Sequence, residues 1–385
     1  MPQSRTLLSR TGQAMVHCMA ALAAASALFA FPHPVRAKDL YSFLGAVTLP
    51  NNATFDKTVI GGLSGIAYEP ASKKWLLISD DKSAYGPARF YTARVELPDG
   101  FLSTVRFTDM TPLTDPKAAG AADPVVTKTP YSDPEAIAVS GNHILWTSED
   151  SWKARAQNTL KEATLEGVTT RDYDIPDDLK IDFDKKTGPL DNNGFESLAV
   201  DGSGAKIWVG VESPLVQDAP LPDEKNGAPV RLTEIDRKSG KVDKQFVYPL
   251  EHRAAAALPG KHADGPGLTE LADVDSTHLL AMERSWVEGV TNFVQIYLVD
   301  TAGASDVQSM SSLKGQHYTP VRKKLLIDLN KVGIQMDNYE GMALGPVLAD
   351  GRRLLLVSVD NNFNPLEKTI IAAFAVDLKA ALSGE

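Results

Sequence analysis

The stretch Gly62-Leu-Ser-Gly-Ile-Ala67 is the first of five related phrases in this chain of 385 residues. The other four are Pro134-Glu-Ala-Ile-Ala138, Phe195-Glu-Ser-Leu-Ala199, Gly267-Leu-Thr-Glu-Leu-Ala272 and Tyr339-Glu-Gly-Met-Ala343. Their final alanines are 71, 61, 73 and 71 residues apart. A regular period of short apolar segments is the sequence signature of repeat architectures. The phrase therefore predicts a fold built from repeated units.

Each copy of the phrase is followed by a turn that contains Gly, Asp, Ser or Asn, and then by an apolar run that ends in an acid. Two apolar runs joined by such a turn are typical of a β-hairpin. The five second runs are Trp75-Leu-Leu-Ile-Ser-Asp80, Ile144-Leu-Trp-Thr-Ser-Glu149, Ile207-Trp-Val-Gly-Val-Glu212, Leu279-Leu-Ala-Met-Glu283 and Leu354-Leu-Leu-Val-Ser-Val-Asp360.

Further apolar runs fill the rest of each period, for example residues 89–96 and 103–108 after the first hairpin. Four strands per period are typical of a blade of a β-propeller. We therefore expect an all-β fold, a β-propeller of five four-stranded blades. The long segments 110–130 and 300–325 leave room for a sixth blade.

The last repeat contains only one later strand, at residues 369–376. The missing strand can come from the N-terminal segment 40–48, which would close the ring and leave no open sheet edge. Residues 150–191 and 213–231 are rich in Pro, Asp, Lys and Gly. We expect these two segments to be surface insertions.

The first 37 residues have the pattern of a secretory signal peptide. Arg5 and Arg10 precede an apolar run, and Val35-Arg36-Ala37 places small residues at positions −3 and −1 of a cleavage site. Cleavage there would leave residues 38–385 as a single propeller domain. We expect it to be a periplasmic or secreted monomer without stable membrane insertion. An uncleaved membrane anchor is the alternative, although the apolar run is short for a bilayer span.

Removal of the signal peptide would also change the charge of the chain. The segment contains the only cysteine, Cys18, together with three arginines and no acid, so the formal net charge would change from −10 to −13. The mature chain would have no disulfide and no thiol chemistry. An acidic chain lacks the clustered Lys and Arg that bind phosphate backbones, so we expect no nucleic-acid partner. Its surplus of carboxylates suits divalent cations better.

The hairpin pattern predicts where many of the acids lie. In an antiparallel pair, the start of the first strand lies beside the end of the second. Both ends should therefore meet at one mouth of the central channel. The residues that start the first strands are Glu135, Glu196 and Glu340, with Ser64 and Thr269 in the other two copies. The acids that end the second strands are Asp80, Glu149, Glu212, Glu283 and Asp360. In the Ser64 and Thr269 blades we expect a gap that substrate or water can enter.

Carboxylates this close together need bound cations or pairing with Arg and Lys. Oxygen-rich clusters suit Ca²⁺, which takes about six to eight oxygen ligands. The expected ligands of one or more calcium ions are Glu135, Glu196, Glu340, Glu149, Glu212, Asp80 and Asp360. Adjacent asparagines would add neutral oxygens; they are Asn192, Asn193, Asn338, Asn361 and Asn362. Structural salt bridges and turn capping by Asp and Asn are the alternative reading of the same residues.

At these residues the chain resembles the phytase-like family, described as "esterase-like activity of phytase". The resemblance runs from about Leu40 to Leu378. It implies an exported β-propeller and, through a wider similarity to β-propeller phytases, calcium-dependent hydrolysis of phosphate esters. The matching motifs are Gly62-Leu-Ser-Gly-Ile-Ala67, Ser132-Asp-Pro-Glu-Ala-Ile-Ala138, Asn193-Gly-Phe-Glu-Ser-Leu-Ala199 and Asn338-Tyr-Glu-Gly-Met-Ala343.

Together, the acid cluster and the resemblance favour a hydrolase of small-molecule esters, of the phosphomonoester or phytate type. A bound metal would lower the pKa of the attacking water. A calcium-dependent lactonase or carboxylesterase, and a non-catalytic metal-stabilised propeller of the envelope, remain open alternatives. The expected catalytic residues are Glu135, Glu196, Glu340 and Arg284. The expected substrate contacts are Arg284, Lys82, Lys153, Ser64 and Thr269.

Overall fold

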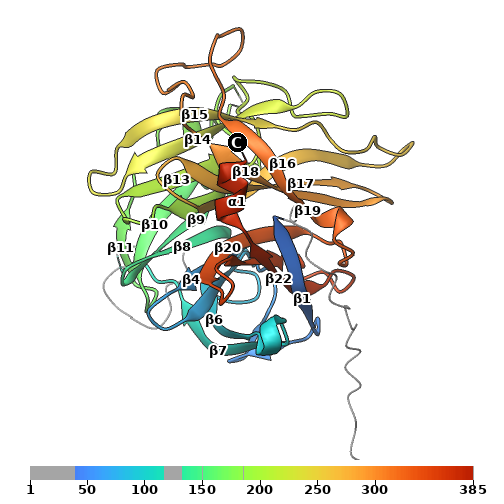
Figure 1. Cartoon of the computed structure of the whole chain (residues 1–385). Coiled ribbons are helices and arrows are strands. Elements are labelled where there is room, and N and C mark those ends of the chain that lie inside the picture. The colour runs from blue at the N-terminus through green and yellow to red at the C-terminus, as the bar shows by residue number, and fades with distance from the viewer. Residues whose placement is uncertain (1–39, 117–131, 150, 185, 385) are drawn as a thin grey trace, which may run out of the picture. The chain divides into compact units, whose positions relative to one another are not determined.

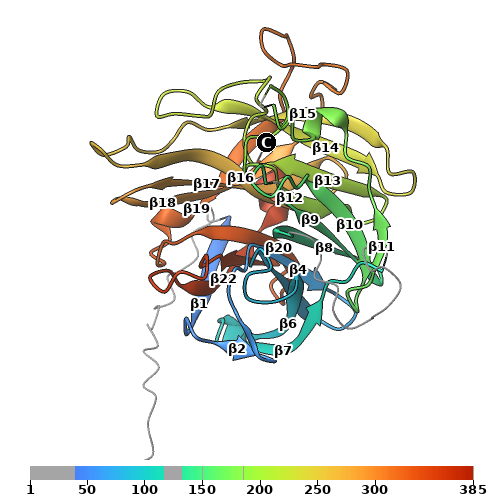
Figure 2. The same cartoon turned by 180° about the vertical axis from the view of Figure 1, so that it is seen from behind.

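Five antiparallel sheets of four strands make up the part of the chain described by the computed structural model, residues 40–116, 132–149, 151–184 and 186–384 (Figures 1 and 2). The first sheet contains β4 (Gly65–Glu69), β5 (Lys74–Ser79), β6 (Arg89–Glu96) and β7 (Thr104–Pro112). The second contains β8 (Pro134–Ser140), β9 (His143–Ser148), β10 (Thr159–Thr164) and β11 (Thr169–Asp172). The third contains β12 (Phe195–Val200), β13 (Lys206–Val211), β14 (Ala228–Asp236) and β15 (Val242–Leu250).

The remaining two sheets complete the set. The fourth contains β16 (Ala263–Asp273), β17 (His278–Val287), β18 (Thr291–Asp300) and β19 (Arg322–Asp328). The fifth contains β20 (Tyr339–Val347), β21 (Arg353–Val359), β22 (Thr369–Val376) and β1 (Tyr41–Leu49). The smaller elements are β2 (Thr54–Phe55), β3 (Thr58–Val59), three 3₁₀ turns at Pro98–Gly100, Asp177–Leu179 and Leu329–Lys331, and the helix α1 (Leu378–Ser383).

The first strand of each sheet lies at the centre of a ring. Strand β4 contacts β8, β8 contacts β12, β12 contacts β16, β16 contacts β20, and β20 contacts β4 again. Each sheet is thus one blade, which confirms the predicted five-bladed propeller. Within the described residues there is no sixth blade; residues 301–321 form a loop before β19.

The chain ends close the ring as predicted. Strand β1 pairs with β22 in antiparallel register, with Tyr41 opposite Val376 and Leu49 opposite Thr369. This pairing gives the last blade its fourth strand and covers the edge of β22. The predicted signal peptide, residues 1–37, lies outside the described residues. No helix in the described ranges has the length and apolar character needed to cross a bilayer.

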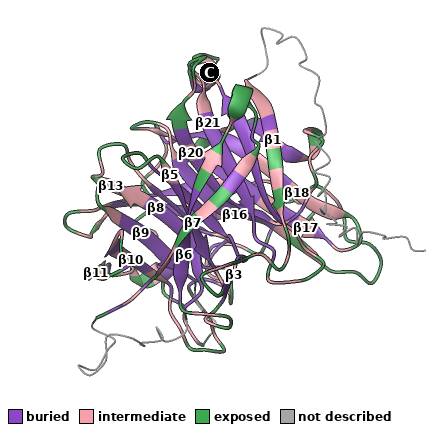
Figure 3. Ribbon diagram, turned by 90° about the horizontal axis from the view of Figure 1, so that it is seen from below, coloured by how far each residue is buried: buried purple, intermediate pink, exposed green. Residues whose placement is uncertain are grey.

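The core lies between the blades. The second strands are almost continuously buried because neighbouring blades cover both faces of each sheet. Trp75, Trp146 and Trp208 all lie in these strands and are buried. Figure 3 shows the buried strands around the centre, whereas the outer strand β1 is only partly buried. The core therefore holds five hairpins in fixed positions around one channel.

One predicted insertion is wrong. Residues 150–191 contain β10 and β11, the two outer strands of the second blade. These strands are short and polar, and β11 has no buried residue. An outer strand has one face against solvent and needs few apolar residues, so the composition of this region resembled that of a loop. The other predicted insertion, at 213–231, is irregular as far as β14, which begins at Ala228.

Candidate functional site

Three glutamates of the repeated phrase open the inner strands and point into one pocket of about 700 Å³. Glu135, Glu196 and Glu340 line this pocket and are 6%, 7% and 7% exposed. In each of these hairpins the strand register shifts at the glutamate, as between Phe195 and Ser197. A β-bulge leaves its extra residue outside the ladder and redirects the side chain. The bulge explains how a charged residue in a core strand reaches the channel mouth.

Acids at the ends of the second strands join these glutamates. Asp80, Glu212 and Asp360 line the same pocket, and Glu149 lies buried beside Glu135 and Glu196. Gly267 provides room for Glu212, because a Cβ atom there would lie 2.5 Å from its carboxylate oxygen. The hairpin geometry thus gathers seven carboxylates from four blades at one mouth.

The fourth blade differs from the prediction by one residue. Leu280 lies opposite the motif alanine Ala272, as Leu76 lies opposite Ala67 in the first blade. Counted from these pairs, the residue equivalent to Asp80 is Arg284 and not Glu283. A shift of one residue moves a side chain to the other face of a sheet. The expected place of Glu283 at the mouth is therefore wrong.

Glu283 instead lies between the fourth blade and the third. Its carboxylate accepts hydrogen bonds from the Tyr248 hydroxyl, at 2.6 Å, and from the backbone N–H of Glu251, at 3.1 Å. It also forms an ion pair with Lys323. These partners satisfy a carboxylate that is 2% exposed, so it is a structural group.

Arg284 lies at the mouth in the position expected for Glu283, and its positive charge neutralises part of the acid cluster. Its guanidinium lies 3.0 Å from Glu340 Oε1 and 3.5 Å from Glu212 Oε1. Burial opposes the charge of Arg284, but Glu340, Glu212 and Glu196 outweigh it and raise the pKa of the guanidinium. The salt-bridge alternative is thus realised on one side of the pocket.

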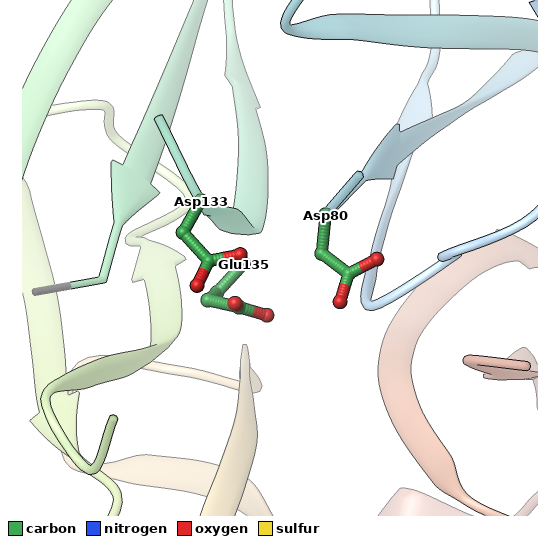
Figure 4. A group of neighbouring side chains, drawn as sticks. All are labelled: Asp80, Asp133 and Glu135. Atoms are coloured by element: carbon green, nitrogen blue, oxygen red, sulfur yellow. The ribbon is translucent and has the colours of Figure 1, made fainter. Parts of the chain in front are cut away.

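The other side of the pocket has two overlapping groups of three carboxylates. Ligand oxygens of Asp80, Asp133 and Glu135 all lie within 4.8 Å of one another, and so do those of Glu135, Glu149 and Glu196. Figure 4 shows Asp133 and Glu135 side by side, with Asp80 facing them from the end of β5 in the neighbouring blade. Glu135 belongs to both groups and so connects them.

These carboxylates are held in conditions that disfavour their charge. Burial, followed by the charges of Asp133 and Glu340, raises the pKa of Asp80 to about 8. Burial also raises the pKa of Glu212 to about 7, although Arg284 opposes the shift. The pKa of Glu135 and that of Glu196 lie well above the usual range because of burial and of neighbouring acids. Without a cation, the cluster holds protons at neutral pH.

The residues present fit a divalent cation that prefers oxygen. Asp80 Oδ1 is buried and has no hydrogen-bond partner among the described residues. Asn192, Asn193 and Asn338 add amide groups to the wall, and no Cys or His occurs among the described lining residues. Carboxylate and amide oxygens suit Ca²⁺ or Mg²⁺ and not zinc. Of the other predicted asparagines, Asn362 lines the pocket, whereas Asn361 is buried outside it.

The predicted substrate contacts are only partly brought together. Lys82 lines the pocket, 2.9 Å from Asp133 and 2.9 Å from the amide oxygen of Asn192. Lys153 is exposed and does not line it. Ser64 and Thr269 are 2% and 1% exposed, and their hydroxyls donate to backbone carbonyls. The expected gap at these two blades is absent, because both side chains are packed and hydrogen-bonded.

Sequence reasoning missed several acids of the site. Asp133 stands two residues before Glu135 in a quoted motif, and is fully buried in the first carboxylate group. Its position before a proline does not single it out, because Asp115-Pro116 repeats the pair and Asp115 is also buried. The remaining acids of the wall lie in loops or in strand extensions beyond the repeat; they are Asp191, Asp264, Asp337 and Glu367.

Comparison with solved structures finds proteins of very low sequence identity, among them two described as propellers. The Dos1 propeller is 9% identical, with 81% of this chain and 67% of that chain covered, at a TM-score of 0.34. The Cps50 (Swd1) β-propeller domain of Myceliophteria thermophila is 10% identical, with 87% and 99% covered, at 0.35. A GH43_12 protein from a capybara gut metagenome is 10% identical, with 85% and 52% covered, at 0.44.

The comparison by sequence is more specific. No curated protein matches the chain. The family model described as "Phytase-like: Esterase-like activity of phytase" matches residues 58–363, from β3 to the loop after β21. This span contains the inner strand of every blade and every carboxylate of the two groups of three. The chain therefore belongs to the phytase-like family.

Proposed function

We propose that the chain is a hydrolase of phosphate esters that works with divalent cations, calcium foremost, at the mouth of its central channel. The observation that carries this proposal is the pair of carboxylate groups that share Glu135. Buried like charges at this spacing need a counter-charge, and two adjacent cation positions match the needs of a phosphate with several anionic oxygens. Membership of an esterase-type propeller family supports the same reading.

Each part of the pocket has a separate role in this proposal. Asp80, Asp133, Glu135, Glu149 and Glu196 would hold the cations. A bound divalent cation supplies charge neutralisation at the phosphate and lowers the pKa of a bound water. Arg284 is fixed by two carboxylates and lines the pocket, so its guanidinium would donate to a substrate oxygen. Lys82 adds a second positive charge at the rim.

A carboxyl ester or lactone is the second candidate substrate, and the charge of the wall favours it. Among the described residues, ten carboxylates and two basic side chains line the pocket. An anionic phosphate would be repelled by this wall unless cations occupy it, whereas a neutral ester would not. The same residues can hold a cation beside an ester carbonyl. The two candidates therefore differ in substrate charge and not in the residues used.

Parallel assays distinguish the candidates. Purified protein is given a phosphate monoester and a lactone, each with added calcium and with EDTA, while the bound metal is measured by elemental analysis. Calcium-dependent turnover of the phosphate ester alone supports the proposal. Turnover of the lactone alone favours the second candidate. A melting temperature that falls with EDTA while neither ester is cleaved would favour a non-catalytic propeller and contradict both.

A single substitution tests the metal positions. Glu135→Gln removes the carboxylate that both groups share, so we expect calcium affinity to fall by more than about tenfold, with hydrolysis falling in parallel. Isothermal titration with calcium measures the first effect. The matched control is Glu162→Gln in β10, which removes a carboxylate paired with Arg237 outside the pocket. Equal calcium affinity in Glu135→Gln and in the wild-type protein would contradict the metal positions.

A further inference from the structure

A second, smaller pocket of about 380 Å³ lies next to the acidic one and has a different character. Its wall consists of aromatic, aliphatic and amide side chains, and none of the described residues that line it is charged. The wall includes Asn52, Tyr85, Asn361 and Phe363. A pocket of this size and composition suits an uncharged ring and not a phosphate.

An aromatic pair forms the main surface of this second pocket. The rings of Tyr85 and Phe363 are stacked, with centroids 4.6 Å apart and an angle of 26° between their planes. Tyr85 is 58% exposed, which leaves much of its side chain available to a ligand. Phe363 is fixed from behind by Gly61, where a Cβ atom would lie 3.1 Å from the ring.

The backbone is strained in both loops that carry these rings, the loop of Tyr85 and the loop of Phe363. Lys82 and Ser83, in the loop of Tyr85, have φ angles of 51° and 58°, and Asn362 and Phe363 have 47° and 50°. This region is uncommon for residues other than glycine, and it is a genuine outlier for a bulky residue such as phenylalanine. Strain of this kind persists where the surroundings fix it, and it concentrates at ligand sites.

Hydrogen bonds show what fixes the strained loop. The side-chain oxygen of Asn361 accepts from the backbone N–H of Gly62, at 3.0 Å, and from that of Phe363, at 3.2 Å. Asn361 is 2% exposed, and its amide nitrogen remains as a donor at the wall of the pocket. The Phe363 ring is thus held in one place by a buried polar side chain.

The second pocket adjoins the acidic one at Gly62. A Cβ atom on Gly62 would clash with Asp80 Oδ1 and would lie 2.7 Å from the Phe363 ring. One glycine therefore separates a carboxylate of the first pocket from the aromatic floor of the second. The loop after β21 also alternates between them, since Asp360 and Asn362 line the first pocket and Asn361 and Phe363 the second.

We propose that the Tyr85–Phe363 pocket binds a flat, uncharged aromatic ring, the alcohol part of an ester whose reacting group lies in the acidic pocket beside Asp80. The inference rests on the proposed function and names a substrate class for it: aryl esters. The ring would stack on Tyr85, as aromatic pairs do. The amides of Asn52 and Asn361 would bond polar substituents of the ring. Hydrolysis would release the ring as its alcohol.

The binding step can be tested without turnover. The probe is 2-naphthol, titrated by fluorescence into the full-length protein in EDTA. We expect it to bind, and we expect Tyr85→Ala to weaken binding by about tenfold or more, since the stacking surface is lost. Tyr85→Phe should bind as the wild type does. The matched control is Phe101→Ala, another aromatic residue that is exposed (48%) but lies outside both pockets.

Turnover then separates the two proposals. With 2-naphthyl phosphate, Tyr85→Ala should raise KM severalfold, and with ethyl phosphate it should leave KM unchanged. Naphthol binding without cleavage of either ester would contradict the proposed function but leave the ring pocket standing. The ring pocket would be refuted by equal naphthol affinity in Tyr85→Ala and wild type, or by no binding of naphthol at all. It would also be refuted if the protein bound methyl glucoside, whose ring is not aromatic, more tightly than 2-naphthol.

Discussion

At the scale of single residues, the buried carboxylates at the mouth of the channel outnumber the basic side chains beside them, Arg284 and Lys82. Arg284 neutralises the side formed by Glu212 and Glu340. On the other side Lys82 pairs with Asp133, and within the described residues neither Asp80 nor Glu135 forms an ion pair. Buried acids without compensation favour their protonated forms. A cation would therefore bind on the side where buried carboxylates lack a basic partner, beside Asp80 and Glu135.

The stability of the metal-free protein should therefore fall as pH rises. The pKa of Asp80 is raised to about 8 in the folded state, so this residue holds a proton that the unfolded chain releases near pH 4. Its contribution to stability is complete below about pH 4 and is lost as pH rises through about 8. Melting temperatures in EDTA between pH 5 and pH 9 measure the effect.

Two controls make this pH dependence specific to the carboxylate cluster. Asp80→Asn removes one of the titrating groups, so its melting temperature should depend less on pH. Calcium favours the ionised carboxylates and should weaken or reverse the trend. A melting temperature in EDTA that rises from pH 5 to pH 9 would contradict the assignment.

At the scale of elements, the turn before β4 connects the two pockets. Gly62 has a φ angle of 61°, and its carbonyl accepts from the backbone N–H of Asp80 at 2.9 Å. Its missing Cβ leaves room for both Asp80 and Phe363. One position thus needs glycine for two reasons, backbone conformation and close contact.

The substitution Gly62→Ala should lower the stability of the protein for both reasons, the backbone conformation and the close contact. A left-handed conformation costs an alanine about 1–2 kcal/mol, and the clash with Asp80 adds to that cost and displaces the carboxylate. The control is Gly141→Ala, with a φ of 59° and open space around its Cβ, which should show the backbone cost alone. Urea unfolding measures stability, and calcium titration measures the displacement. Equal losses in both variants, with calcium affinity unchanged, would refute the close contact.

The repeat made the hairpins predictable, and it made the site predictable only as far as the hairpins are alike. Glu135, Glu196 and Glu340 could be placed because their phrases share one register. The sequence did not show the bulges that turn these side chains into the channel, since a bulge depends on the pairing of both strands. Glu283 was wrongly placed at the mouth, where Arg284 lies instead, because register follows the pairing of Ala272 with Leu280 and not the last acid of a run.

At the scale of the whole molecule, β1 completes the last blade by pairing with the outer edge of β22. All eight residues of β22 are buried, and Phe374 packs against Tyr41 and Phe43 of β1, at ring distances of 6.2 and 5.5 Å. Strand β1 also ties the C-terminus, since the backbone N–H of Asp377 donates to the Leu40 carbonyl at 2.8 Å. The N-terminal strand thus closes the ring that positions all five hairpins.

Removal of β1 should therefore disturb more of the protein than this one strand. A chain that starts at residue 50 exposes the unpaired backbone and apolar side chains of β22, which is a template for association with other chains. We expect it to aggregate in size-exclusion chromatography and to lose calcium binding, because Glu340 and Asp360 lie in the same blade. A chain that starts at residue 38 keeps β1 and is the control. If the shorter chain stayed monomeric and bound calcium like the control, the ring would not depend on this closure, and the mouth would be held by the inner strands alone.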